Sequence, residues 1–179
     1  SEIHVLNLKT FEYTPSAKAK FATVDAAKQI DDVKSRIKAL HHGTDKAGDF
    51  YRNVTALVNK YVSFRIPEIA DELYKIDDAV KAGFGWELGP FETWDVLGVE
   101  KTAQMMEASG FAPASWVKEM TAAGNKSFYI TENGKRQFYD VATKSYKDIP
   151  GADAFILLDN YRTQKPLFQN AGATLSDIG

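Results

Sequence analysis

In the first half of the chain, apolar residues recur at intervals of three and four, the period of one face of an α-helix. This spacing predicts a helix that begins at Thr23, a suitable N-cap, and has His41 and His42 in its last turn before Gly43. A second apolar stripe runs over residues 50–76. Pro67 lies inside this stripe. Because proline lacks an N–H group and crowds the preceding turn, the stripe should kink or divide there.

Three shorter helices are predicted after the second stripe. Pro90 suits the first position of a helix, so residues 90–97 should form a helix that ends at Gly98. Residues 99–109 and 113–123 also show helical spacing, and a glycine follows each of them closely.

The period changes to two in the segment 127–141. Two aromatic-rich, alternating runs flank Asn133-Gly134, which is the strongest short-range signal for a β-hairpin. Tyr146 and Lys147 fit a short third strand. One late hairpin is therefore expected in a chain that is otherwise helical.

The two ends of the chain carry weaker signals. Residues 1–22 lack helical periodicity and predict an extended linker with a short strand at Ile3–Leu8. The spacing over residues 153–162 predicts a helix, and the tail from Thr163 is interpreted as a loop or an incipient strand. The expected fold class is mainly α, a multi-helix domain with one β-hairpin.

Composition adds exclusions rather than a function. Of the 179 residues, 44% are hydrophobic and 26% charged, which is typical of a globular domain. A formal net charge of −2 gives no electrostatic reason to expect nucleic acid as a partner. No apolar run approaches the ~18 residues of a membrane span. The absence of cysteine fits a reducing compartment, so a cytoplasmic location is expected. Because the first residue is serine, we expect an excised piece of a longer protein.

The stretch KAGFGWELGPFETWDVLG, residues 81–98, raises the main chemical question. A phosphate cradle needs a strand that leads into a glycine turn and then a helix, whereas a helix leads in here. Gly83, Gly85 and Gly89 are spaced GxGxxxG rather than GxGxxG, and Glu87 would repel a phosphate. A nucleotide site is therefore not expected.

Two interpretations of this stretch remain. In the structural one, Gly83 ends a helix, the next two glycines allow a sharp turn, and three aromatic side chains fill the core: Trp86, Phe91 and Trp94. In the other, an aromatic, glycine-hinged loop at a helix N-terminus approaches a ligand. The substrate-binding candidates are then Trp86, Gly89, Pro90 and Phe91.

Other polar groups have simpler explanations. His41 and His42 could suggest a metal, but neighbouring helical residues point in different directions, so a helix-end role is expected and no metal ligand is predicted. Asp77 and Asp78 could do acid–base chemistry only in a dry, convergent site; solvated helix faces or N-caps are expected instead. Six basic residues could meet an anionic ligand, although a solvated hairpin surface is the default: Lys118, Lys126, Lys135, Arg136, Lys144 and Lys147.

A longer motif resembles a known family. The segment Ile76-Asp77-Asp78-Ala79, then Gly83-Phe84-Gly85, then Gly89-Pro90-Phe91-Glu92 resembles the C-terminal domain of 3-hydroxyacyl-CoA dehydrogenases. The resemblance implies a helical fold of the 6-phosphogluconate dehydrogenase C-terminal-like type. It also implies a parent protein that oxidises 3-hydroxyacyl-CoA to 3-ketoacyl-CoA with NAD in fatty acid β-oxidation.

The wider chain is similar to one subtype, the bacterial multifunctional fatty-acid oxidation proteins. NLKTFEYTPSAKAKF, FYITENGKRQFYD and NAGATLSDIG carry this resemblance. It implies a linker plus one helix over residues 1–43 and the second helical domain over residues 44–162, with a hairpin near 127–147. Residues 163–179 would lead toward a crotonase-type domain.

The resemblance also implies that this helical copy is not catalytic. In the family, a His–Glu pair and a serine lie on a nucleotide-binding domain that is not in this chain. An asparagine from an Asn-Arg pair is replaced here by Phe64-Arg65, and phenylalanine cannot hydrogen-bond a carbonyl group. No catalytic residue is therefore assigned, and no cofactor is expected in this chain, with NAD bound by the parent.

Three functions remain open at this stage. The first is a non-catalytic module that packs against sister domains (a nucleotide-binding domain, a first helical domain and a crotonase-type domain) and closes the acyl-CoA cleft. Alone, it would expose an apolar patch and could form a homodimer. The second is an acyl-CoA-binding module without a redox role. The third is an enzyme that uses the carboxylates of Asp77, Glu87 and Glu92.

Overall fold

The computed structural model describes residues 3–16, 19–132, 134–151, 165–170 and 172–177. Among these residues there are seven helices and three small antiparallel sheets, which confirms a mainly α fold with a late hairpin. The predicted helix at 153–162 lies outside the described residues. The chain divides into two compact units, Ser1–Tyr51 and Arg52–Gly179. Among the described residues, no helix has the length and apolarity that crossing a bilayer requires.

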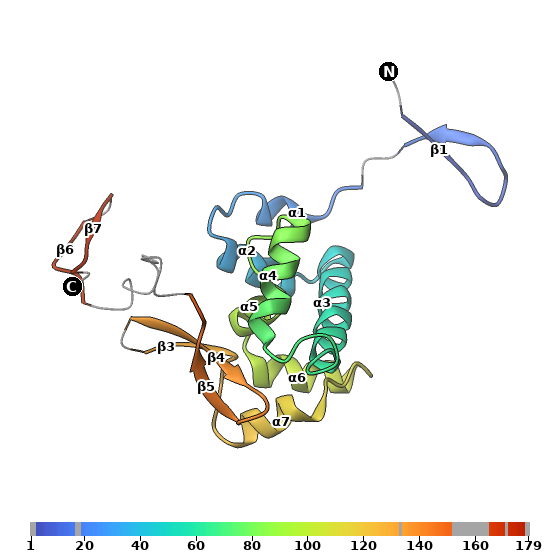
Figure 1. Cartoon of the computed structure of the whole chain (residues 1–179). Helices are drawn as coiled ribbons and strands as arrows, with labels where there is room; N and C mark the ends of the chain where they lie inside the picture. The colour runs from blue at the N-terminus through green and yellow to red at the C-terminus, as the bar shows by residue number, and fades with distance from the viewer. Residues whose placement is uncertain (1–2, 17–18, 133, 152–164, 171, 178–179) are drawn as a thin grey trace. The chain divides into compact units, whose positions relative to one another are not determined.

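The first unit contains a hairpin and two short helices (Figure 1). Strand β1 (His4–Leu6) pairs with β2 (Tyr13–Pro15), so the short strand predicted at Ile3–Leu8 is confirmed within a hairpin. Helix α1 (Ala22–Ala27) packs against α2 (Val33–His42).

The prediction of one continuous helix from Thr23 to His42 is wrong. It is interrupted because Asp32 accepts a hydrogen bond from the Ser35 N–H group, which begins α2 as a separate helix. Thr23 does not cap α1, whose N-cap is Phe21. The Thr23 N–H group donates instead to the Asp45 carboxylate, at 3.0 Å.

The second unit is built on a helical core. Helix α3 (Lys46–Phe64) leads into this unit, and Pro67 separates it from α4 (Leu73–Phe84), as the proline predicted. Three short helices follow close to their predicted bounds: α5 (Pro90–Leu97), α6 (Val99–Ala108) and α7 (Ser115–Ala122).

A three-stranded meander follows the helices. Strands β3 (Tyr129–Glu132), β4 (Lys135–Asp140) and β5 (Ser145–Asp148) pair in sequence order, with Ile130 opposite Gln137 and Tyr139 opposite Tyr146. This confirms the hairpin and the third strand. Near the C-terminus, β6 (Phe168–Gln169) and β7 (Thr174–Leu175) form a small hairpin of their own.

Phe128 lies at the centre of the core of the second unit. Its ring is fully buried and has edge-on contacts with Phe91, Trp94 and Trp116 at centroid distances of 5.0, 5.2 and 5.8 Å. The prediction that Trp86 fills this core is wrong, because 47% of Trp86 is exposed. It stands beside Phe84 on the surface, at a centroid distance of 6.4 Å.

The turn between α4 and α5 brings two backbones together. The C-cap of helix α4 lies two residues later than predicted, at Gly85 rather than Gly83, because Gly85 adopts the left-handed conformation with φ of 66°. Gly89 then precedes α5. A Cβ atom on Gly89 would fall on the Asp77 side chain and lie 2.5 Å from the Asp77 Cα atom.

This close approach predicts opposite effects for two glycines. Gly89→Ala should lower the free energy of unfolding by about 1–3 kcal/mol, since α4 and α5 must separate to admit a methyl group. Gly83→Ala is the matched control. It lies inside α4 with open space around it and should raise stability by about 0.5–1 kcal/mol. Urea unfolding measures both; a stable Gly89→Ala variant would contradict the close approach.

Candidate functional site

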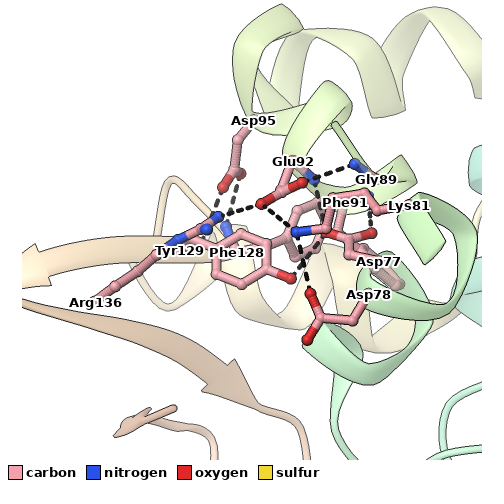
Figure 2. A network of polar contacts seen from close by, with 10 residues as sticks. All are labelled: Asp77, Asp78, Lys81, Gly89, Phe91, Glu92, Asp95, Phe128, Tyr129 and Arg136. Carbon is pink, nitrogen blue, oxygen red and sulfur yellow. Dashed lines mark hydrogen bonds and ion pairs between the residues drawn. The ribbon is translucent and has the colours of Figure 1, made fainter. Parts of the chain in front are cut away.

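Three acidic residues meet where α4, α5 and the hairpin come together (Figure 2). Asp77 lies on α4, and Glu92 and Asp95 lie on α5. With Lys81, Tyr129 and Arg136 they form what we call the acid network.

Asp77 caps the start of α5 from the neighbouring helix. Its Oδ1 atom accepts from the Phe91 N–H group at 2.9 Å, and Oδ2 accepts from the Glu92 N–H group at 3.0 Å. The Tyr129 hydroxyl donates to Oδ2 at 2.8 Å. Gly89 has no side chain with which to cap α5, and Pro90 has no N–H group that needs a partner. The fully buried Asp77 therefore supplies the missing cap.

Glu92 closes the same turn and binds two cations. Its Oε2 atom accepts from the Gly89 N–H group at 2.7 Å. Its Oε1 atom lies 2.7 Å from Arg136 Nη2 and 3.2 Å from Lys81 Nζ. Burial opposes ionisation of Glu92, but the Gly89 N–H group and these two cations hold its pKa below the usual value. Glu92 is thus an ionised, paired carboxylate.

Asp95 fixes the entry into the hairpin. Its two oxygens accept from the Phe128 N–H group at 2.7 Å and from the Tyr129 N–H group at 2.9 Å. Arg136, on the next strand, stacks over the Tyr129 ring at 4.2 Å. Asp95 therefore fixes the backbone N–H groups before and after the Phe128 side chain, which enters the core at this point.

Burial has a strong effect on the two aspartates and the tyrosine. It raises the pKa of Asp77 to about 7, and it raises the pKa of Asp95 to about 7, with the Asp77 charge adding to the second shift. Burial and the Asp77 charge also raise the pKa of Tyr129, so its hydroxyl remains protonated as a donor. Shifted pKa values often mark catalytic sites, but buried structural networks produce them too.

The hydrogen bonds of the acid network indicate a structural network rather than a catalytic site. Each of the six carboxylate oxygens of Asp77, Glu92 and Asp95 already has a donor, and five backbone N–H groups are among these donors. A general acid or base needs access to a reacting proton. The acid network is therefore built to join helices to the hairpin. Glu87, the third acid of the carboxylate hypothesis, is exposed.

The acid network does not suit a dinucleotide either. The N–H groups at the start of α5, which would bind a phosphate, are bonded to Asp77 and Glu92. Among the described residues, no group of three or more His, Cys, Asp or Glu side chains is arranged so that it could hold a metal ion. His42, at the end of α2, donates through Nδ1 to the Lys38 carbonyl oxygen at 2.7 Å.

An apolar pocket of about 440 Å³ lies on the other side of α4. Residues of α3, α4 and the turn before α5 line it: Val58, Tyr61, Val62, Arg65, Ile69, Ile76, Ala79, Val80, Phe84, Trp86 and Pro90. Of the four predicted substrate-binding residues, Trp86 and Pro90 line this pocket. Phe91 lies in the core and Gly89 lies against Asp77. The four predicted residues therefore do not form one site: two line the apolar pocket, and the other two lie in the core or against the acid network.

The basic residues of the hairpin region are largely paired with acids. Lys118 pairs with Glu107, Lys144 with Glu119, Lys147 with Asp140 and Lys135 with Asp148. Arg136 departs from the expected solvated surface, because its guanidinium group reaches the buried Glu92.

Sequence reasoning missed Asp95 and Tyr129. Asp95 follows the buried Trp94 and interrupts the apolar residues of a short helix, which is a signal that could have been noticed. Its partners lie 33 and 34 residues further along the chain, beyond the range of helical or strand periodicity. Tyr129 is indistinguishable in the sequence from the other aromatic residues of the hairpin.

The raised pKa values predict a particular pH dependence. Burial raises the pKa of Asp77 and of Asp95 to about 7 in the folded state, whereas an aspartate in the unfolded chain keeps a pKa near 3.8. The folded state therefore binds more protons between these limits, and the free energy of unfolding should fall as pH rises from 5 to 7.

Asp95→Asn tests this assignment. One oxygen can still accept, but an amide nitrogen then faces the second N–H group, so stability at pH 7 should fall by about 1–3 kcal/mol. The dependence on pH should weaken by up to about 1.4 kcal/mol per pH unit, because one titrating group is gone. Urea unfolding at several pH values measures both quantities. Identical slopes in the two proteins would contradict the raised pKa of Asp95.

Comparison with known proteins finds the same family that the motif around Asp77 and Glu92 resembles. A family model described as "3-hydroxyacyl-CoA dehydrogenase, C-terminal domain" matches residues 50–140, about half of the chain. Every residue of the acid network lies inside this match.

One curated relative matches nearly the whole chain. The chain is 38% identical over 178 residues to a probable 3-hydroxyacyl-CoA dehydrogenase of Bacillus subtilis (strain 168). The match covers 99% of this chain and 22% of the relative, so the chain spans about a fifth of that protein's length. From the family match and this similarity, the chain belongs to the family of 3-hydroxyacyl-CoA dehydrogenase C-terminal domains.

Proposed function

We propose that the chain is a non-catalytic helical module of a 3-hydroxyacyl-CoA dehydrogenase. The parent protein would oxidise 3-hydroxyacyl-CoA to 3-ketoacyl-CoA with NAD in fatty acid β-oxidation, in the cytoplasm. The acid network carries this proposal. The polar groups of the family motif Gly89-Pro90-Phe91-Glu92 join α4 to α5, and Glu92 joins α5 to Arg136 of the hairpin, which supports a structural role.

The organisation of the parent protein is part of the proposal. Residues 1–43 would be a linker plus a helix, residues 44–162 the second helical domain, and residues 163–179 the exit toward a crotonase-type domain. The name and length of the Bacillus relative support a longer dehydrogenase, since only 22% of it is matched. The NAD-binding domain would be a separate part of that protein.

An exposed apolar face supports the packing role. On α3, Leu57, Tyr61 and Phe64 are spaced by four and three residues, so they share one side of the helix, and they are 52, 59 and 47% exposed. Phe84 and Trp86 are exposed beside the pocket that Tyr61 also lines. These five residues form the α3–α4 apolar face. Apolar surface gathered in this way favours burial against another domain.

The proposal predicts no redox activity in the isolated chain. Purified chain mixed with NADH and acetoacetyl-CoA should show no loss of NADH absorbance above a blank, because the hydride chemistry would take place on another domain. An intact 3-hydroxyacyl-CoA dehydrogenase serves as the positive control. Turnover by the pure chain that scales with its concentration would refute the proposal.

The α3–α4 apolar face also predicts self-association of the isolated chain. Light scattering should show a mass that rises with concentration toward a two-fold dimer. Leu57→Glu should shift the chain to monomer, because a carboxylate cannot be buried there without a partner. Gln104→Glu, at an exposed polar position of α6, is the matched control and should leave the mass unchanged. A monomeric wild type at high concentration would count against the exposed face as a packing surface.

A further inference from the structure

The hairpin of β1 and β2 has the same register as the hairpin of β4 and β5. In the first hairpin, Leu6 lies opposite Tyr13. In the second, Tyr139 lies opposite Tyr146, and the neighbouring pairs of the two hairpins match at the same displacement along the sequence. The two hairpins therefore correspond pair by pair, although few of their residues are identical.

The loops of the two hairpins are also alike. Phe11 and Lys144 occupy equivalent positions, and among the described residues they are the non-glycine residues with positive φ, at 58 and 53°. At the start of each loop, a side-chain oxygen accepts from the backbone N–H group three residues further on, at 3.4 Å for Asn7 and 3.0 Å for Asp140. Loops of this shape are common in hairpins, so the faces of the strands decide whether the likeness extends further.

The second hairpin buries the face that the first hairpin exposes. Tyr139 is 2% exposed, and Tyr146 is half-buried, with its hydroxyl group donating to the Ser127 carbonyl oxygen at 2.6 Å. Their equivalents in the first hairpin, Leu6 and Tyr13, are 40 and 72% exposed. A two-stranded hairpin is marginal in water without a surface to pack on. Among the described residues, the first hairpin therefore lacks the cover that its equivalent has.

The second hairpin shows what such a cover consists of. Phe138 packs on Tyr74 of α4, with a distance of 4.9 Å between the ring centroids. The Tyr139 N–H group donates to the Phe128 carbonyl oxygen at 2.7 Å, directly before β3. A helix thus covers one face of the hairpin, and the strand before it pairs with its edge.

The first hairpin leaves the corresponding edge open. Asn7 donates its N–H group to the Glu12 carbonyl oxygen across the hairpin, at 2.9 Å. Because N–H groups alternate in direction along an antiparallel strand, the Leu6 N–H group points away from β2. Among the described residues, β1 pairs with β2 and with no other strand. An unpaired edge of this kind is a ready site for a further strand.

We propose that residues 3–16 are the closing hairpin of another helical unit, which precedes them in the natural protein and has the same fold as residues 52–148. In that unit, a helix equivalent to α4 covers Val5, and a strand equivalent to β3 accepts from the Leu6 N–H group. This goes beyond the proposed function, which assigns residues 1–43 to a linker plus a helix and gives the hairpin no partner. It makes no claim about redox activity, so turnover by the isolated chain would refute the proposed function alone.

Hydrogen–deuterium exchange with mass spectrometry compares the 179-residue chain with the natural protein that includes the preceding residues. Peptides within residues 3–16 should exchange almost freely in the 179-residue chain and about 100-fold more slowly in the longer protein, because the preceding unit covers the hairpin there. The equivalent peptide of the second hairpin, residues 137–147, is the control and should be equally protected in both proteins.

Two outcomes of this comparison would overturn the proposal. The first is equal exchange of residues 3–16 in the two proteins. The second is protection that appears in the 179-residue chain as its concentration is raised, which would identify a second copy of this chain as the cover.

Variants of the longer protein test which face of the hairpin is covered. Tyr13→Ser should speed the exchange of residues 3–16 about tenfold, because Tyr13 corresponds to the half-buried Tyr146 and loses its packing and its hydroxyl hydrogen bond. Glu12→Ser, on the opposite face, introduces the residue found at the exposed equivalent position, Ser145, and should leave the exchange unchanged. The reverse order of the two effects would overturn the proposal.

The preceding sequence gives a further test of the partner's identity. The equivalence requires an alternating apolar strand directly before β1, at the spacing that separates β3 from β4, joined to β1 by a short turn. A polar or proline-rich segment in its place would overturn the proposal, even if another domain protects the hairpin.

Discussion

Asp77 and Asp95 each accept hydrogen bonds from two backbone N–H groups that lie outside their own helices. The architecture of the second unit depends on these four hydrogen bonds. Asp77 ties α4 to the start of α5, and Asp95 ties α5 to the start of β3. Short helices are marginal in isolation, and so is a small antiparallel sheet. The two carboxylates let each of these elements stabilise the next.

This constraint explains the family motif in physical terms. Glycine at 89 allows the backbones of α4 and α5 to approach, and proline at 90 begins α5 without a free N–H group. Glu92 then turns back to the Gly89 N–H group and draws Arg136 from the hairpin. The motif was a candidate ligand-binding loop in the sequence, and in the structure its polar groups connect the helices to the sheet. The exposed apolar surface lies on the far side of α4, around the apolar pocket.

Most helices and strands could be predicted from the sequence, but the hydrogen bonds that join them could not. Proline and glycine positions predicted the division at Pro67 and the extent of α5, and alternation predicted the hairpin, because these signals are local. Trp86 was placed in the core since aromatic residues are usually buried, but the left-handed Gly85 turns it outward. The interruption before Asp32 was hidden because the apolar spacing continues across it. Asp95 and Tyr129 could not be paired, since no periodicity links positions 34 residues apart.

Native-state hydrogen exchange tests the central claim most directly. If the aspartates hold α4, α5 and β3 together as one cooperative unit, the amides of Phe91, Glu92, Phe128 and Tyr129 should exchange only through global unfolding. Their protection should then track the free energy of unfolding as urea is added. Exchange of the Phe128 and Tyr129 amides at a much lower free energy than the amides of α5 would show that the hairpin detaches independently, and would contradict the account.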